Sequence, residues 1–234
     1  MRTNVPGGIR VVAVAGGEVL DLGTLAHGEH PELVLHQHGW RSTAPLGAEL
    51  ASDGTLAVSY LVTPAAGLRP ERVATRRDPG VSADEVGALH QRVAAYALVT
   101  SERGVLLTQF TSATHVAGEW GLPGGGLDAG EAPAEAVHRE VWEETGQRIE
   151  LEPLLAVQSS HWVGRAPSGV LEDFHAVRIV YRASCPDPVD PVVHDVGGTT
   201  SDARWVAFPD IGDLPLTRSW QTLEALAGLG AAPT

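Results

Sequence analysis

Short apolar runs separated by glycine, proline and aspartate fill the first third of the chain. Three of them, IRVVAVAG, ELVLHQH and TLAVSYLVTP, are rich in valine and leucine. Such runs favour β-strands bounded by turns. We therefore predict a small β-rich unit over residues 1–75. Three roles are open for it: pairing two protomers into a homodimer, covering a binding site, or extending the edge of a sheet.

The pattern changes at Leu68, where the polar, arginine-rich stretch LRPERVATRRDPGVSADE begins. We interpret it as an exposed connection and place the linker at residues 76–88. Ser82 could cap a short helix within it. The segment AAYALVT then begins the first strand of a second domain, residues 89–234.

The second domain alternates strand-like and helix-like patterns. Apolar segments predict further strands at GVLLTQFT, LEPLLAVQ, FHAVRIVYRAS and ARWVAF. Apolar residues at helical spacing in LTRSWQTLEALAGL predict a closing helix. Strands on both sides of a central helix indicate a mixed α/β fold.

The central helix, PAEAVHREVWEET, places three carboxylates together. Pro133 suits the first turn of a helix, and Gly146 suits its end. Between them, Glu140, Glu143 and Glu144 cover one arc of roughly 100°. Like charges at this spacing repel each other, so the cluster needs an explanation.

The overall charge of the chain limits the binding partners that it can have. The net charge is −13, and all 16 basic residues are arginine. Nucleic-acid binding needs a basic face, so we expect no nucleic-acid partner. Cys185 is the only cysteine, which excludes an intrachain disulfide and favours the cytoplasm. The apolar run from Val11 to Ala15 is too short for a signal peptide, and no segment has the length of a membrane span.

A divalent cation explains the acidic helix better than a solvated surface does. Arg139 is the only Arg or Lys in the helix, so its acids are not interleaved with bases as on an ordinary solvent face. The preceding loop, LPGGGLDAGE, lets oxygen atoms or phosphates approach its backbone. Hard ions such as Mg²⁺ or Mn²⁺ prefer carboxylate and carbonyl oxygens. Such an ion makes the crowding of carboxylates favourable.

Residues 125–147 resemble the Nudix box, G-x5-E-x7-R-E-U-x-E-E-x-G-U, where U is apolar. Eight positions match: Gly125, Glu131, Arg139, Glu140, Val141, Glu143, Glu144 and Gly146. The last apolar position is Gln147 here, a departure that concerns packing. The resemblance extends over roughly residues 90–215. It implies an α/β/α sandwich around a mixed sheet and a hydrolase that cleaves the diphosphate bond of a nucleoside diphosphate derivative.

The resemblance also implies roles for the box residues. Glu140, Glu143 and Glu144 would bind the metal, with the Gly125 carbonyl as a further oxygen ligand. Arg139 would orient the glutamates. Glu131 would hold loop and helix together from outside the metal's ligands.

Other candidates lie outside the box. Nudix enzymes use either a box glutamate or a downstream loop acid as general base, and Asp202, Glu172 and Asp173 are candidates for the second option. Each is also a common type of turn or strand-end residue. His161, Trp162 and Phe174 could stack on a nucleotide base, or could be ordinary core residues.

The substrate is less sharply indicated. The signature of NADH-cleaving Nudix enzymes is absent, since VQSSHWVG stands in its place, and the proline of ADP-ribose-cleaving members is off register. We therefore favour nucleoside triphosphates or nucleotide sugars over dinucleotides. A nucleotide-sensing module without turnover is the alternative.

The segment HGEHPELVLHQH contributes one more candidate site. It holds His27, His30, His36 and His38, and on a strand His36 and His38 would share one face. A zinc site is an alternative to ordinary polar histidines there.

Overall fold

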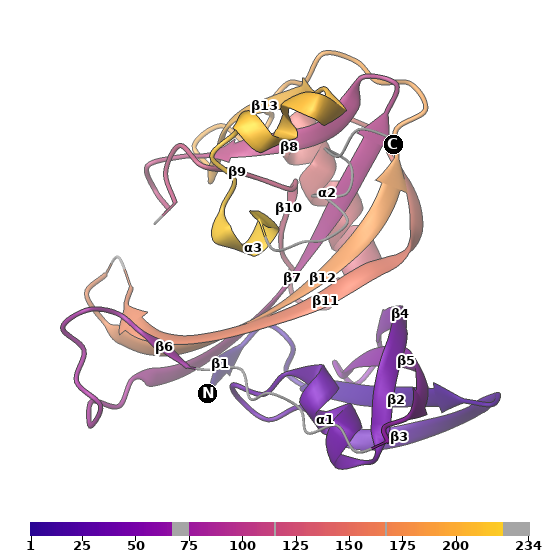
Figure 1. The fold of residues 1–234 in the computed structure, drawn as a ribbon. Helices are drawn as coiled ribbons and strands as arrows, with labels where there is room; N and C mark the ends of the chain where they lie inside the picture. Colours follow the sequence, from indigo (N-terminus) through magenta and orange to yellow (C-terminus); the bar gives the residue numbers. More distant parts are fainter. Residues whose placement is uncertain (67–74, 115, 167, 222–234) are drawn as a thin grey trace. The chain divides into compact units, whose positions relative to one another are not determined.

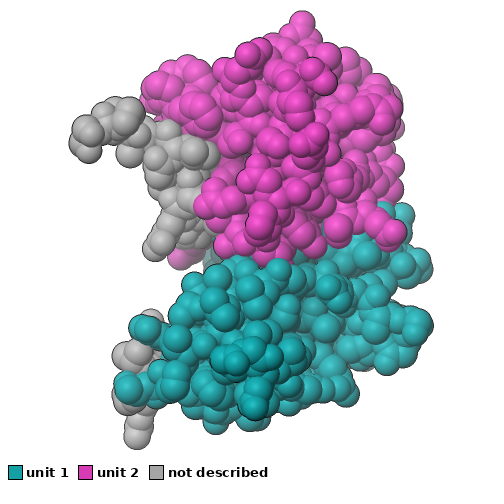
Figure 2. All heavy atoms as spheres, turned by 90° about the vertical axis from the view of Figure 1, so that its right-hand side faces the viewer, with its two compact units in different colours: residues 1–94, 126–133, 156–179 teal, residues 95–125, 134–155, 180–234 magenta. Residues whose placement is uncertain are grey.

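The structure is a computed structural model that describes residues 1–66, 75–114, 116–166 and 168–221. The chain divides into two compact units, shown in two colours in Figure 2. Unit 1 comprises Met1–Ala94, Gly126–Pro133 and Ala156–Ile179, and unit 2 comprises Ala95–Gly125, Ala134–Leu155 and Val180–Thr234. Among the described residues, none of the helices is long and apolar enough to span a membrane.

A small four-stranded sheet in unit 1 confirms the predicted β-rich N-terminal region (Figure 1). Its strands run in the order β3 (Glu18–Thr24), β2 (Ile9–Ala15), β5 (Leu56–Pro64) and β4 (Trp40–Leu50). Strands β2 and β5 alternate buried and more accessible side chains, because successive side chains of a strand point to opposite faces. Their buried residues form the core beneath helix α1 (Pro31–Gln37).

Helix α1 corrects the expectation of a strand at ELVLHQH. Pro31 occupies its first turn, and the backbone N–H of Glu32 donates to Nδ1 of His30, which caps the helix. His36 and His38 therefore do not share a strand face. Each ring instead lies within hydrogen-bonding distance of the backbone carbonyl four residues earlier.

The larger, nine-stranded sheet contains the strands of the second domain. Its main order is β13-β8-β7-β12-β11-β6, with β1 and β10 paired to β7, and β9 paired to β8. Its nine strands are β1 (Arg2–Thr3), β6 (Arg76–Arg77), β7 (Ala88–Ser101), β8 (Gly104–Phe110), β9 (Trp120–Gly121), β10 (Gly124–Gly126), β11 (Glu150–Arg165), β12 (Leu171–Ser184) and β13 (Thr200–Val206). Both parallel and antiparallel pairs occur, which confirms the mixed α/β class.

The predicted connection between the domains is only partly described. Residues 67–74 lie outside the described residues, and Arg76–Arg77 form β6, which pairs with β11. Ser82 starts no helix: it lies in a turn that leads into β7 at Ala88. The predicted domain boundaries remain a proposal.

The last elements within the described residues are a 3-10 helix, Phe208–Asp213, and helix α3, Arg218–Gln221. The rest of the predicted closing helix lies outside the described residues. Trp220 of α3 is buried, and its ring meets Tyr96 edge to face at 4.9 Å between centroids.

Candidate functional site

Helix α2 (Pro133–Thr145) places the three glutamates where the sequence predicted them. Ala136, Val137 and Val141 are fully buried and fix the helix by its apolar side. Gly146 ends the helix at φ +68°, a left-handed conformation that glycine adopts without strain. The charged arc of α2 is thus held by a helix whose other side belongs to the core.

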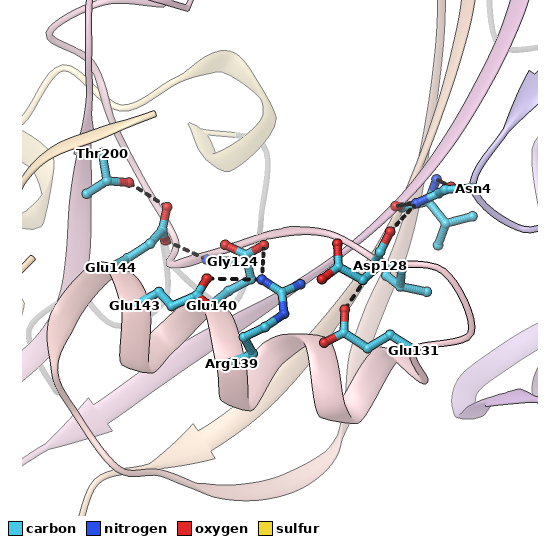
Figure 3. A network of polar contacts seen from close by, with 11 residues as sticks. Asn4, Gly124, Asp128, Glu131, Arg139, Glu140, Glu143, Glu144 and Thr200 are labelled. Carbon is cyan, nitrogen blue, oxygen red and sulfur yellow. Dashed lines mark hydrogen bonds and ion pairs between the residues drawn. The ribbon is translucent and has the colours of Figure 1, made fainter. Parts of the chain in front are cut away.

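Glu144 is the most constrained of the three (Figure 3). It is only 5% exposed, its Oε2 accepts from the Gly124 N–H at 2.9 Å, and its Oε1 accepts from the Thr200 hydroxyl. Burial raises the pKa of the Glu144 carboxyl to about 7, although these two hydrogen bonds act in the opposite direction. A nearby cation would reverse this effect by stabilising the ionised form.

Glu140 lies directly against the glycine-rich loop. A Cβ on Gly125 would overlap the Glu140 carboxylate, so this close approach requires glycine. The Gly125 backbone and the Glu140 side chain are therefore neighbours, as a shared cation would need.

Arg139 joins two of the carboxylates. Its Nη1 donates to Glu140 Oε1 at 2.9 Å and to Glu143 Oε2 at 3.1 Å. These charge-assisted bonds hold the two side chains in one orientation. Glu143 is the most accessible of the three glutamates, with 41% of its side chain exposed.

The segment between β12 and β13 is attached to the end of α2. The N–H groups of His194 and Asp195 donate to the Glu143 carbonyl at 2.7 and 3.1 Å. The ring of His194 stacks on Trp142 at 5.0 Å between centroids. Residues beside the glutamates therefore anchor this segment by both backbone and side chain.

Gln147, the departure from the motif, is 2% exposed and has specific partners. Its Nε2 donates to the Thr145 carbonyl at 3.0 Å, and its Oε1 accepts from the Val189 N–H at 3.0 Å and from Cys185 Sγ at 3.8 Å. A polar side chain fills this apolar position because the segment after β12 satisfies its amide.

Glu131 lies in unit 1, in the loop before α2. Its Oε2 accepts from the Asp128 N–H at 2.8 Å, and its own N–H donates to the Asp128 carbonyl at 3.1 Å. The contact of the Glu131 carboxylate with Asp128 is drawn in Figure 3, and the two contacts together make Glu131 part of a closed turn.

The candidate general bases have different surroundings. Asp202, in unit 2, forms an exposed ion pair with Arg204 at 2.7 Å. Glu172, in unit 1, forms an ion pair with Arg2 at 2.7 Å. Asp173, also in unit 1, lies between His27 and His161.

The three predicted stacking residues do not form one group. Trp162 and Phe174 stack on each other, with ring centroids 4.2 Å apart. His161 instead contacts Asp173. All three belong to unit 1.

Sequence reasoning missed two partners of Glu144. Thr200 approaches from a strand 56 residues downstream, and no local pattern marks it. The Gly124 N–H lies in the glycine-rich loop, which was recognised only as a place of close backbone approach.

Comparison with known proteins gives consistent matches. A family model described as "NUDIX domain" matches residues 90–226. A Mycobacterium tuberculosis protein named "Putative 8-oxo-dGTP diphosphatase 3" is 33% identical over 124 residues, which are 51% of this chain and 53% of that protein. A Methanocaldococcus jannaschii protein named "ADP-ribose pyrophosphatase" is 32% identical over 130 residues, 54% of this chain and 66% of that protein.

The chain thus spans about half the length of the first of these relatives. Among solved structures, a MutT NUDIX hydrolase from Burkholderia pseudomallei is 30% identical, with a TM-score of 0.42. That match covers 60% of this chain and 98% of the other.

Proposed function

The chain belongs to the NUDIX domain family, and from this premise we propose that it is a divalent-metal-dependent hydrolase of nucleoside diphosphate derivatives. The observation that carries the proposal is the set of three glutamate carboxylates on one arc of α2. One of them is buried and held by Gly124 and Thr200.

The residues fit a hard divalent ion. Three carboxylates lie beside a loop whose Gly125 has no side chain to block the approach of Glu140. Oxygen donors in this arrangement suit Mg²⁺ or Mn²⁺. Glu140, Glu143, Glu144 and the Gly125 carbonyl would hold the ion. When bound, it would neutralise phosphate charge and activate water for attack on phosphorus.

The chain's own residues would orient these ligands. Arg139 fixes Glu140 and Glu143 relative to each other, and Thr200 fixes Glu144. In the proposed reaction, water attacks one phosphorus of the diphosphate. The bridging P–O bond breaks, and a nucleoside monophosphate leaves. Asp202, Glu172 and Asp173 remain the proposed alternatives for the general base outside α2.

The substrate proposal follows the sequence. We favour a nucleoside triphosphate or a nucleotide sugar over a dinucleotide. The relatives' names include both a diphosphatase of an oxidised nucleotide and an ADP-ribose pyrophosphatase. A panel of these substrates with Mg²⁺ or Mn²⁺ decides between them. A kcat/KM for NADH or ADP-ribose tenfold above that for every triphosphate would overturn our preference.

Glu143→Gln and Glu144→Gln test the metal site. Each removes a ligand charge at nearly constant shape, so kcat should fall about a thousandfold, roughly 4 kcal/mol of barrier. Glu152→Gln, which changes an exposed carboxylate of β11, is the matched control and should keep its activity. Near wild-type rates in both α2 variants would exclude the mechanism.

A nucleotide-sensing module is the alternative function. The wild-type protein would then bind the panel nucleotides without releasing phosphate or nucleoside monophosphate. Calorimetry and product analysis on the same samples separate the two functions.

We further propose a cytoplasmic location and the ability to form a homodimer. The single cysteine supports the first. Sedimentation of the full chain tests the second.

A further inference from the structure

A second cluster of metal-ligand residue types lies in unit 1. His27 comes from the connection between β3 and α1, His161 from β11 and Asp173 from β12. His27 Nε2 lies 2.8 Å from Asp173 Oδ1, and His161 Nε2 lies 2.5 Å from the same oxygen. One ligand atom from each residue can be chosen so that all three lie within 4.8 Å of one another.

The local backbone is shaped to bring the two imidazoles together. Gly28 has φ +77°, and a Cβ at this position would lie 2.7 Å from His161 Nδ1. Glycine therefore allows both the turn and the approach of the ring. The rings of His27 and His161 meet edge to face, with centroids 5.3 Å apart.

His161 has a partner on its other nitrogen. Thr75 Oγ1 lies 2.9 Å from His161 Nδ1. A metal-binding imidazole commonly uses its second nitrogen in such a contact, which fixes the orientation of the ring. His161 Nε2 is thereby directed toward Asp173.

A series of hydrogen bonds between neighbouring side chains holds the segments of the cluster together. Gln91 Nε2 lies 3.0 Å from Nδ1 of the fully buried His175, and His175 Nε2 lies 2.9 Å from Ser159 Oγ. The Ser159 hydroxyl donates to the Glu29 carbonyl, two residues after His27. This series of hydrogen bonds therefore connects β11 and β12 to the segment that carries His27.

The cluster has an unsatisfied group. This group is His27 Nδ1, which is buried without a hydrogen-bond partner, so the contact of Nε2 with Asp173 Oδ1 is the one that orients this ring. Asp173 Oδ1 is shared by two rings. Burial raises the pKa of the Asp173 carboxyl, but hydrogen bonds from His161 and His27 outweigh this, and its pKa lies below the usual value.

We propose that His27, His161 and Asp173 bind one divalent transition-metal ion, separate from the ion proposed at the glutamates. Two imidazoles and one carboxylate suit Zn²⁺ and similar ions, whereas the oxygen-only set on α2 suits Mg²⁺. A tetrahedral ion with bonds of about 2.0–2.1 Å needs its ligand atoms about 3.3 Å apart. The two rings must therefore move away from Asp173 by about half an ångström or somewhat more.

Three protein ligands leave one coordination position for water or a small ligand. The three side chains are 13–22% exposed, so solvent reaches the cluster. The site uses none of the residues proposed to bind Mg²⁺ and shares with the proposed hydrolase only Asp173, one of the three alternatives for its general base, so metal binding at this site is tested separately from hydrolysis.

Titration of the metal-free full-length protein with Co²⁺ in excess Mg²⁺ tests the proposal. The excess Mg²⁺ occupies the oxygen site. One equivalent of Co²⁺ should then bind with the intense visible absorption of a four-coordinate ion, and Zn²⁺ should displace it. His161→Gln and Asp173→Asn should each weaken binding at least tenfold. His36→Gln, in a half-buried histidine of α1 outside the cluster, and Glu143→Gln should bind as the wild type does.

Two results would overturn the site. One is the absence of Co²⁺ and Zn²⁺ binding to the wild-type protein in Mg²⁺. The other is equal binding by the wild type and by both ligand variants, which would show adventitious binding elsewhere. Thermal unfolding distinguishes a variant that has lost the metal site from one that has lost its fold. Zn²⁺ should raise the Tm of the wild type and of His36→Gln. It should leave the Tm of His161→Gln and Asp173→Asn unchanged. If one ligand variant does not fold, the other decides.

Discussion

At the scale of single residues, the candidate active site depends on atoms that carry no charge. Gly125 contributes by lacking a Cβ, Gly124 by its N–H and Thr200 by its hydroxyl. The glutamates supply the chemistry, but these neighbours decide where the carboxylates lie. Substitutions that leave every charge in place should therefore still impair the site.

Gly125→Ala should displace the Glu140 carboxylate, because the new Cβ would overlap it. We expect kcat/KM to fall at least about tenfold while the protein stays folded. Gly212→Ala is the control, since a Cβ there meets nothing within 4 Å. Full activity of Gly125→Ala would show that Glu140 needs no fixed position.

Thr200→Val removes one of the two bonds that fix Glu144. A hydrogen bond to a charged group contributes about 1.5–3 kcal/mol, so the Mg²⁺ concentration for half-maximal rate should rise about tenfold or more. Thr108→Val, at another buried threonine, should leave it unchanged. Equal Mg²⁺ dependence in the two variants would argue against a role for Thr200.

At the scale of elements, helices α1 and α2 were not equally predictable from the sequence. Pro133 and Gly146 mark the ends of α2 within the sequence itself, and the structure confirms both. Helix α1 was mistaken for a strand because a run of seven residues fits either period. The decisive signals, His30 as cap and Pro31 in the first turn, were not weighed.

Contacts between distant segments were beyond sequence reasoning for a physical reason. Thr200 and Glu144 meet only when β13 and α2 are both in place. The His27, His161 and Asp173 cluster likewise assembles from three segments, although each of its residues drew attention for a different role. Periodicity predicts which face of an element is buried, but not which element covers it.

Gln147→Leu tests how the end of α2 is tied to the segment after β12. Leucine has a similar size but loses the contacts to Thr145, Val189 and Cys185. The free energy of unfolding should fall by about 1–2 kcal/mol, measured by urea denaturation. Gln109→Leu, on a more accessible glutamine, should change it less. A Gln147→Leu protein as stable as the wild type would show that these contacts contribute nothing net.

At the scale of the whole molecule, the first residues of the chain belong to unit 1 together with the first half of β7, residues 88–94. Strand β1 pairs with His90 and Gln91 of β7. Asn4 Nδ2 donates to the carbonyls of Val93 and Leu127, and its Oδ1 accepts from the Val93 N–H. One side chain therefore satisfies three backbone groups of other segments.

Asn4→Ala should lower the free energy of unfolding by about 1–3 kcal/mol, because it removes the side-chain hydrogen bonds to all three groups. Thr43→Ala, which removes one exposed hydrogen bond in β4, should lower it by less. Denaturation curves of both variants provide the measurement.

A fragment that begins at Ser82 tests the domain division proposed from the sequence, and we expect this fragment to fold. An unfolded fragment would mean that residues 1–81 complete the core of unit 1.

The stacking of Trp142 on His194 gives the protein an intrinsic fluorescence probe beside the glutamates. Trp142 is 42% exposed and directly precedes Glu143, whose carbonyl holds the His194 backbone. Indole emission responds to a neighbouring imidazole, so any ligand that moves this stack would change the fluorescence of the unlabelled protein. Subtracting the signal of a Trp142→Phe variant isolates this tryptophan from the other five. Occupancy of the glutamate cluster could then be followed in real time, without a dye and without turnover.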